Sequence, residues 1–156
     1  MKYFVPGFSV SKGLKKYAKL SSGTYVLECT DCNVGEPKNL APVDVWNFKF
    51  KILEGAPDAE GKSSVNRNVF HSLNILRPEH PKYKAEWDDP KSGATQFGVD
   101  ELKSIALAMG VTANKKGEIE DEAFVGLKVK ARLYYELARD GSGREFARLT
   151  DWESVD

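Results

Sequence analysis

The chain of 156 residues lacks the short motifs that identify most enzyme classes. It has no glycine-rich phosphate-binding loop, no Gly-x-Ser-x-Gly nucleophile motif and no His-Glu-x-x-His zinc helix. No run approaches the ~18 consecutive apolar residues of a membrane span, and the N-terminal segment lacks the apolar centre of a signal peptide. We therefore expect a cytoplasmic protein that is not an enzyme and has neither a cofactor nor a membrane partner.

Cysteine and histidine are also scarce, with two of each. Cys29 and Cys32 form a lone Cys-x-x-Cys pair at the end of a predicted strand, whereas a thioredoxin-type redox pair opens a helix. A zinc site needs two more ligands, and His71 and His80 lack the required spacing. The sequence thus disfavours a redox or zinc site, and we predict no metal centre. His71 is expected to be a hydrogen-bonded core residue.

An excess of one charge is absent too, because 23 cationic residues balance 23 anionic ones. This argues against binding a polyanion over the whole surface, but it allows a local basic face. The length and a hydrophobic content of 41% fit one domain with one core. We expect a basic lead-in segment over residues 1–22, which is either a solvated terminus or an arm that contacts an anion. The domain proper then spans 23–156.

What the chain does contain is alternation of apolar and polar residues, which predicts strands. Strands are predicted at 23–30, 44–55, 64–76, 127–138 and 144–152, and an amphipathic helix at 98–110, with a further helical turn near 119–126. In the third strand the alternation is less regular. We place His71 on its apolar face and Phe70 on its outward face, and we predict a long loop over 77–97.

Three strands, a helix and two more strands follow one another in the order of the OB-fold, a small, partly open barrel. We therefore predict a mainly β protein, a five-stranded OB-fold barrel with one helix between strands 3 and 4. A split α+β sheet is the competing architecture for the same order of elements.

The outward face of the predicted sheet carries regularly spaced cations. Lys128, Lys130 and Arg132 alternate along one strand and Tyr134 follows them. Such cations stand ~6.6 Å apart, close to the phosphate repeat of an extended nucleic acid, and aromatic rings between them can stack on bases. The candidate nucleic-acid-binding residues are Lys49, Lys51, Arg67, Phe70, Lys128, Lys130, Arg132, Tyr134, Arg139 and Arg144. The alternative is a solvated face whose cations only discourage edge pairing.

The segments "SGTYVLECTDC", "VWNFKFKILEG", "NVFHSLNI", "ELKSIALAMGV" and "EAFVGLKVKARLYYE" occur in an order that resembles a family of bacteriophage proteins. That family, long catalogued as a domain of unknown function, is regarded as OB-fold proteins that bind single-stranded DNA. The resemblance covers roughly residues 20–150. It implies sequence-nonspecific binding of single-stranded DNA in phage DNA replication or recombination, inside the host cytoplasm. Replication or recombination proteins of the phage or host, and a second copy of the chain, are further candidate partners.

Two other functions compete with DNA binding. A protein-interaction module with the same barrel and no DNA affinity would use the aromatic loop that carries Tyr83 and Trp87. A metal-dependent nuclease would use the carboxylates of "EWDDP", including Asp88 and Asp89. No partner acid on a strand is recognisable, so a solvated acidic loop is the favoured interpretation of that segment.

Overall fold

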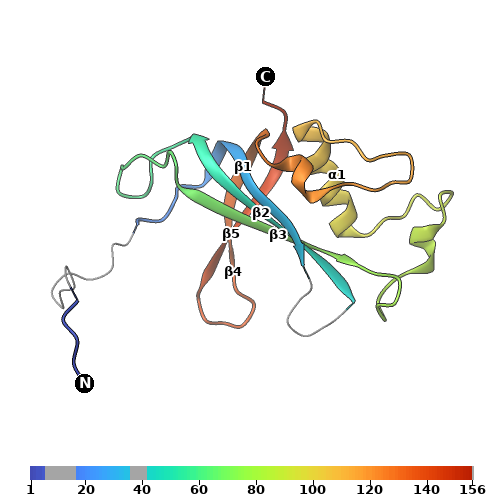
Figure 1. Cartoon of the computed structure of the whole chain (residues 1–156), viewed down its shortest axis with the longest axis horizontal. Coiled ribbons are helices and arrows are strands. Elements are labelled where there is room, and N and C mark those ends of the chain that lie inside the picture. Colours follow the sequence, from blue (N-terminus) through green and yellow to red (C-terminus); the bar gives the residue numbers. More distant parts are fainter. Residues whose placement is uncertain (6–16, 36–41, 156) are drawn as a thin grey trace.

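The computed structural model describes residues 1–5, 17–35 and 42–155, and shows a mainly β protein (Figure 1). Five strands form one sheet in the order β3-β2-β1-β4-β5, and every neighbouring pair is antiparallel. The strands are β1 (Gly23–Gly35), β2 (Val43–Glu54), β3 (Asn68–Leu76), β4 (Lys128–Leu137) and β5 (Glu145–Glu153). The helices are α1 (Phe97–Met109) and the short 3-10 turns η1 (Ala85–Asp88) and η2 (Asp121–Phe124). Within the described ranges, no helix is long and apolar enough to cross a membrane.

The predicted five strands, the helix and the later helical turn are all confirmed, and two strand boundaries are wrong. β1 continues to Gly35, although the first strand was predicted to end at residue 30. It continues because each residue of its second half except Thr30 has a register partner on β2, ending at Gly35 opposite Val45. Pairing between strands thus overrides local propensity. β3 begins at Asn68 rather than residue 64, after a turn in which Asn66 takes a left-handed φ of 71°.

A β-bulge in β1 explains the Cys-x-x-Cys pair. The register between β1 and β2 shifts between Cys29 and Asp31, which leaves Thr30 as the extra residue. Residues three apart on a regular strand would face opposite sides, but the bulge turns both Cys29 and Cys32 into the core. Burial raises the pKa of Cys29 to about 11 and that of Cys32 to about 12. Both side chains are therefore neutral, buried thiols, which suits a packing role.

The core lies on the concave face of the sheet. The predicted inward residues of β1 and β2 are buried, as are Val129, Ala131 and Leu133 of β4, whereas Leu137, also predicted to face inward, is 67% exposed at the end of β4. On β3, Val69, His71 and Leu73 are buried, while Phe70 points outward. The parity predicted for the third strand is thus confirmed. Phe124 from η2 is fully buried and packs edge-on against Phe48, with ring centroids 5.2 Å apart. Such aromatic packing contributes ~0.5–1.5 kcal/mol beyond area burial.

The sheet curls so that its two edge strands, β3 and β5, approach each other. Trp152 of β5 packs against His71 of β3, with ring centroids 5.1 Å apart, and against Phe50 of β2 at 5.8 Å. The alternating strand directions make β3 and β5 parallel to each other. Among the described residues these two strands are not hydrogen-bonded into a ladder, so the sheet is not closed into the predicted barrel.

Helix α1 sits beside this gap and packs against β3, β4 and β5. Its start is fixed on the free edge of β3, because the Gln96 side-chain oxygen accepts from the Leu76 N–H at 2.7 Å and its amide donates to the Leu76 carbonyl at 3.1 Å. A Cβ on Gly98 would lie 1.9 Å from the Asn74 carbonyl oxygen, so only glycine permits this close approach. The helix ends at Gly110, with φ of 78°.

Candidate nucleic-acid interface

The outward face of β2 and β3 places a cation beside an exposed aromatic ring. Lys49 of β2 is the register partner of Phe70 of β3, and side chains opposite each other on antiparallel strands are ~4.5–5.5 Å apart at Cβ. The Phe70 side chain is 66% exposed, and none of the ring contacts found among the described residues involves it. Lys49 makes no ion pair within the described part of the chain. We call Lys49, Lys51 and Phe70 the β2–β3 face.

The outward face of β4 carries Lys128, Lys130 and Arg132, as predicted. Here acidic neighbours lie on β5, since Lys130 is the register partner of Glu153 and the Arg132 Nε lies 3.0 Å from the Asp151 Oδ2. The Arg132 guanidinium also lies 5.9 Å from the centre of the Tyr134 ring. We call Lys128, Lys130 and Arg132 the β4 face.

One row across the sheet joins the two faces. It runs from Asn68 through Lys51 and Glu28 to Lys128 on four successive strands. The Lys51 Nζ lies 3.8 Å from the Glu28 Oε1 in a partly exposed ion pair. The predicted cations of β2 and β4 therefore meet on one sheet, but a carboxylate separates them.

Two of the predicted arginines, Arg67 and Arg144, pair with carboxylates of the turns in which they lie. The Arg67 Nη1 lies 3.3 Å from the Oδ2 of Asp58, a buried carboxylate whose Oδ1 accepts the backbone N–H groups of Glu60 and Lys62. Arg67 therefore anchors the turn before β3.

Arg144 occupies the turn between β4 and β5, where its Nη2 lies 3.0 Å from the Asp140 Oδ2. Hydrogen bonds from Ser142, and then from Arg144, lower the pKa of Asp140. The turn is thus held by its own side chains, and Arg144 already has a carboxylate partner.

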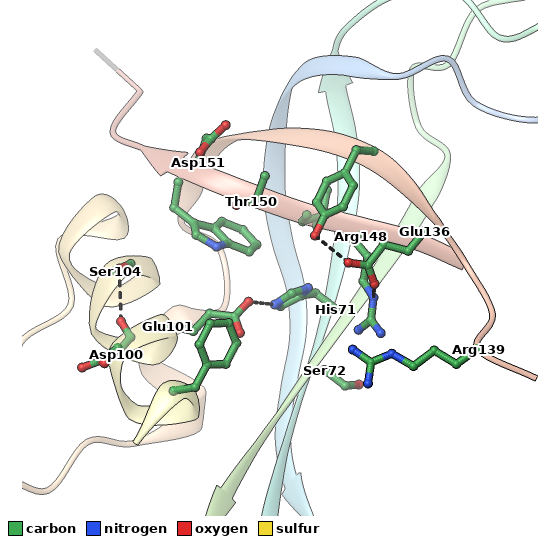
Figure 2. Close-up of a pocket in the computed structure, with 14 residues that line it drawn as sticks. His71, Ser72, Asp100, Glu101, Ser104, Glu136, Arg139, Arg148, Thr150 and Asp151 are labelled. Carbon is green, nitrogen blue, oxygen red and sulfur yellow. Dashed lines mark hydrogen bonds and ion pairs between the residues drawn. The ribbon is translucent and has the colours of Figure 1, made fainter. Parts of the chain in front are cut away.

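Tyr134 and Arg139 line an open pocket of about 710 Å³ between β3, the β4–β5 hairpin and the first half of α1 (Figure 2). The Tyr134 hydroxyl donates to the Glu136 carboxylate at 3.4 Å, and the Arg148 Nε donates to the same carboxylate at 3.1 Å. Figure 2 shows Arg139 extending from beyond the end of β4 toward Ser72 of β3, across the pocket. Arg139 makes no ion pair among the described residues.

The pocket contains residues that sequence reasoning missed, notably Phe97, Arg148 and Trp152. Phe97 had a detectable signal, because it is a large apolar residue at the start of α1 that lies off the buried stripe of that helix. Trp152 had none. Asp151 takes a left-handed φ of 55° at a register shift between β4 and β5, which turns both Leu149 and Trp152 inward although they are three residues apart.

Neither metal chemistry nor the nuclease hypothesis gains support from the geometry. His71 is buried, and its Nε2 lies 2.5 Å from the Glu101 Oε1, which gives it a partner within the fold. In the loop, Asp88 accepts the Tyr83 hydroxyl at 2.6 Å, and Asp89 accepts the Lys91 backbone N–H at 2.9 Å. Across the ranges that the structure describes, no three histidine, cysteine or acidic residues group as metal ligands would.

The N-terminal lead-in is only partly described, since residues 6–16 with Lys12, Lys15 and Lys16 lie outside the described residues. Lys19 packs against the β4–β5 hairpin. Its ammonium group pairs with Glu145 and lies 3.9 Å from the centre of the Tyr135 ring. Lys19 of the lead-in segment therefore already has partners within the domain. Residues 36–41, between β1 and β2, also lie outside the described residues.

A scan against models of protein families found no match to this chain, and a search of curated proteins found none either. The resemblance to phage DNA-binding proteins therefore stays a prediction. Function has to be inferred from the arrangement of the β2–β3 face, the β4 face and the pocket.

Proposed function

We propose that this protein binds single-stranded DNA without sequence preference, and that the β2–β3 face is its main contact surface. The observation that carries the proposal is the pairing of Lys49 with Phe70. Among the described residues, this cation has no ion pair and the exposed ring beside it has no stacking partner. A phosphate on the lysine and a base on the ring would satisfy both groups. Base–aromatic stacking contributes ~1–3 kcal/mol per base and is indifferent to sequence.

The sheet order supports an OB-type architecture for this function. In β3-β2-β1-β4-β5 the long, bulged β1 pairs with both β2 and β4, and the parallel edge strands β3 and β5 are the two that would close a barrel. The proposed fold is an OB barrel left open between these edges, with α1 beside the opening. In OB-folds, the strand 2–3 surface and the loop between strands 4 and 5 bind oligonucleotides.

The proposed contacts differ in kind. Lys49, Lys51 and Lys128 hold phosphates, Phe70 stacks on a base, and Lys130 extends the path along β4. Arg67, Arg132 and Arg144 already pair with carboxylates, so they contribute less, and Lys51 must share its charge with Glu28. The sequence resemblance supports coating of displaced strands in phage replication or recombination as the setting.

The test is a fluorescence anisotropy titration of labelled oligo-dT with the full chain at two salt concentrations. We expect saturable binding that weakens with salt, with a slope of log K against log salt of about −0.7 for each phosphate held. Labelled duplex of the same length is the control and should bind more weakly. No rise in anisotropy, or binding that ignores salt, contradicts the proposal.

A protein-docking function remains the second candidate because of one apolar groove. It has a volume of about 400 Å³ and lies between α1 and residues 111–119, with Val111 and Ile119 in its lining. Leu107 borders it and is 82% exposed. This candidate predicts association with a replication or recombination protein and no change in oligo-dT anisotropy, so the same titration separates the two functions.

A further inference from the structure

The pocket between β3 and β5 lies at the end of the proposed DNA path. Ser72 lines the pocket and follows Phe70 by two residues on the outward face of β3. Residues two apart on a strand are separated by ~6.6 Å, about the reach of one nucleotide in an extended strand. A strand whose base stacks on Phe70 therefore brings its neighbouring nucleotide to the mouth of the pocket.

The lining of the pocket suits an uncharged, flat group rather than a phosphate. Its aromatic members are Phe97, Tyr134 and Trp152, which come from α1, β4 and β5. Its ionisable members are four carboxylates, two guanidinium groups and His71, so acids outnumber fixed cations. A phosphate inside would be repelled, whereas a base offers a π-face to the rings and N–H or C=O edges to the polar groups.

The carboxylates of the pocket are already held in place. Glu101 pairs with His71 at 2.5 Å and Glu136 pairs with Arg148 at 3.1 Å, while Asp100 accepts the Thr95 hydroxyl. The walls are thus positioned before any ligand arrives, which limits the ordering cost of binding.

Arg139 supplies the complementary charge at the mouth. It carries no ion pair among the described residues, and Figure 2 shows it reaching across from the β4–β5 turn toward Ser72. In that position a guanidinium can hold the phosphate of a nucleotide whose base points inward.

We propose that this pocket takes one nucleobase of the bound strand, stacked against the Phe97, Tyr134 and Trp152 rings, with Arg139 on the adjoining phosphate. The inference rests on the proposed function and adds a subsite to it, in which a base leaves the open sheet and enters the gap between β3 and β5. Phe97 is 82% exposed, and a stacked base would cover it.

The test measures occupancy of the pocket and overall DNA binding separately. In the Trp46→Phe, Trp87→Phe double variant, Trp152 is the remaining tryptophan and reports the pocket, while anisotropy of labelled oligo-dT reports binding. We expect oligo-dT to quench Trp152 emission with the same midpoint as the anisotropy. An abasic strand of equal length should leave the emission unchanged. Thymidine monophosphate at equal nucleotide concentration should also leave it unchanged.

A second pair of variants covers the case in which the tryptophan replacements disturb folding. Phe97→Ala should weaken oligo-dT binding roughly fivefold or more and leave abasic-strand binding unchanged. Leu107→Ala is the matched control, because Leu107 is 82% exposed on the same helix but lies outside the pocket. It should change neither.

The possible outcomes distinguish a failure of the pocket subsite from a failure of the proposed function. Normal anisotropy with unquenched Trp152 and an inert Phe97→Ala overturns the subsite and leaves the proposed function standing. Quenching by thymidine monophosphate equal to that by oligo-dT overturns the strand subsite in favour of a mononucleotide site. No anisotropy rise with wild-type protein overturns the proposed function and the subsite together.

Discussion

The β2–β3 face and the β4 strand each place a cation beside an aromatic residue, but the two pairs differ in what else they contact. Lys49 and Phe70 face each other across two strands, with the ring exposed and the lysine outside any described ion pair. Arg132 and Tyr134 are neighbours on one strand, where Asp151 holds the guanidinium and Glu136 accepts the tyrosine hydroxyl.

This difference decides which pair is available to a ligand. A group with a partner must give up that interaction, or share it, before it binds something else. Exposed ion pairs contribute only ~0–1 kcal/mol, so this cost is modest for Arg132, but the neutralised charge also attracts a phosphate less. Alternation alone makes the two strands look equivalent. Acidic residues lie opposite both, since Asp31 is the register partner of Lys49, so we propose the β2–β3 face as the stronger site because of the exposed Phe70 ring and the lack of a described ion pair at Lys49.

The largest expected effect concerns a cation that belongs to the fold. Arg67→Ala leaves the buried Asp58 carboxylate without its guanidinium and should lower the free energy of unfolding by roughly 2–3 kcal/mol. Urea denaturation followed by tryptophan fluorescence measures this loss. The folded variant should bind oligo-dT nearly as well as wild type. A large loss of affinity with unchanged stability would instead place Arg67 on the DNA path.

Removing the exposed ring tests the β2–β3 face directly. Phe70→Ala should weaken oligo-dT binding by ~1–3 kcal/mol, because a stacking platform is lost, and should leave the melting temperature almost unchanged. Phe146→Ala is the matched control, since Phe146 is a 47% exposed phenylalanine on β5. Equal effects of the two variants in the anisotropy titration would contradict the assignment.

Charge removal should separate the two cations by their salt dependence. Lys49→Ala should reduce the magnitude of the slope of log K against log salt by about 0.7, the loss of one phosphate contact. Arg132→Ala should reduce it by less, because Asp151 already neutralises Arg132. Titrations at four or more salt concentrations measure both slopes. A larger reduction for Arg132→Ala than for Lys49→Ala would contradict the comparison of the two faces.

The smallest expected effect is a gain in affinity for oligo-dT. Glu28 lies between Lys51 and Lys128 in the row that joins the two faces, so Glu28→Gln should strengthen oligo-dT binding by about twofold at low salt. Glu79→Gln makes the same change in net charge within the loop at 77–97 and should have less effect. Anisotropy at low salt distinguishes the two, and weaker binding by Glu28→Gln would show that the carboxylate is not an obstacle.

Alternation in the sequence was sufficient to predict the strands, most of the buried residues and the outward position of Phe70, since period-two patterns report burial directly. The bulges at Thr30 and Asp151 were not predictable. Thr30 in β1 and Asp151 in β5 each insert a residue, and only pairing with the neighbouring strand determines where this happens.

The candidate site was predictable in its residue types but not in its pairings. The positions of Lys49 and Lys130 followed from parity, whereas the ion pair of Arg67 with Asp58 depends on how a turn folds back. The pocket could not be predicted from the sequence for the same reason. It forms where β3, β5 and α1 meet, and these elements are far apart in the sequence.

The central claim is that single-stranded DNA lies on the β2–β3 face, and a two-dimensional ¹H–¹⁵N NMR titration with unlabelled oligo-dT tests it most directly. We expect the largest amide shifts at Lys49, Lys51 and Phe70, smaller shifts along β4, and none beside the groove at Leu107. Shifts concentrated around Leu107 and residues 111–119, or no shifts at saturating oligo-dT, would contradict the account.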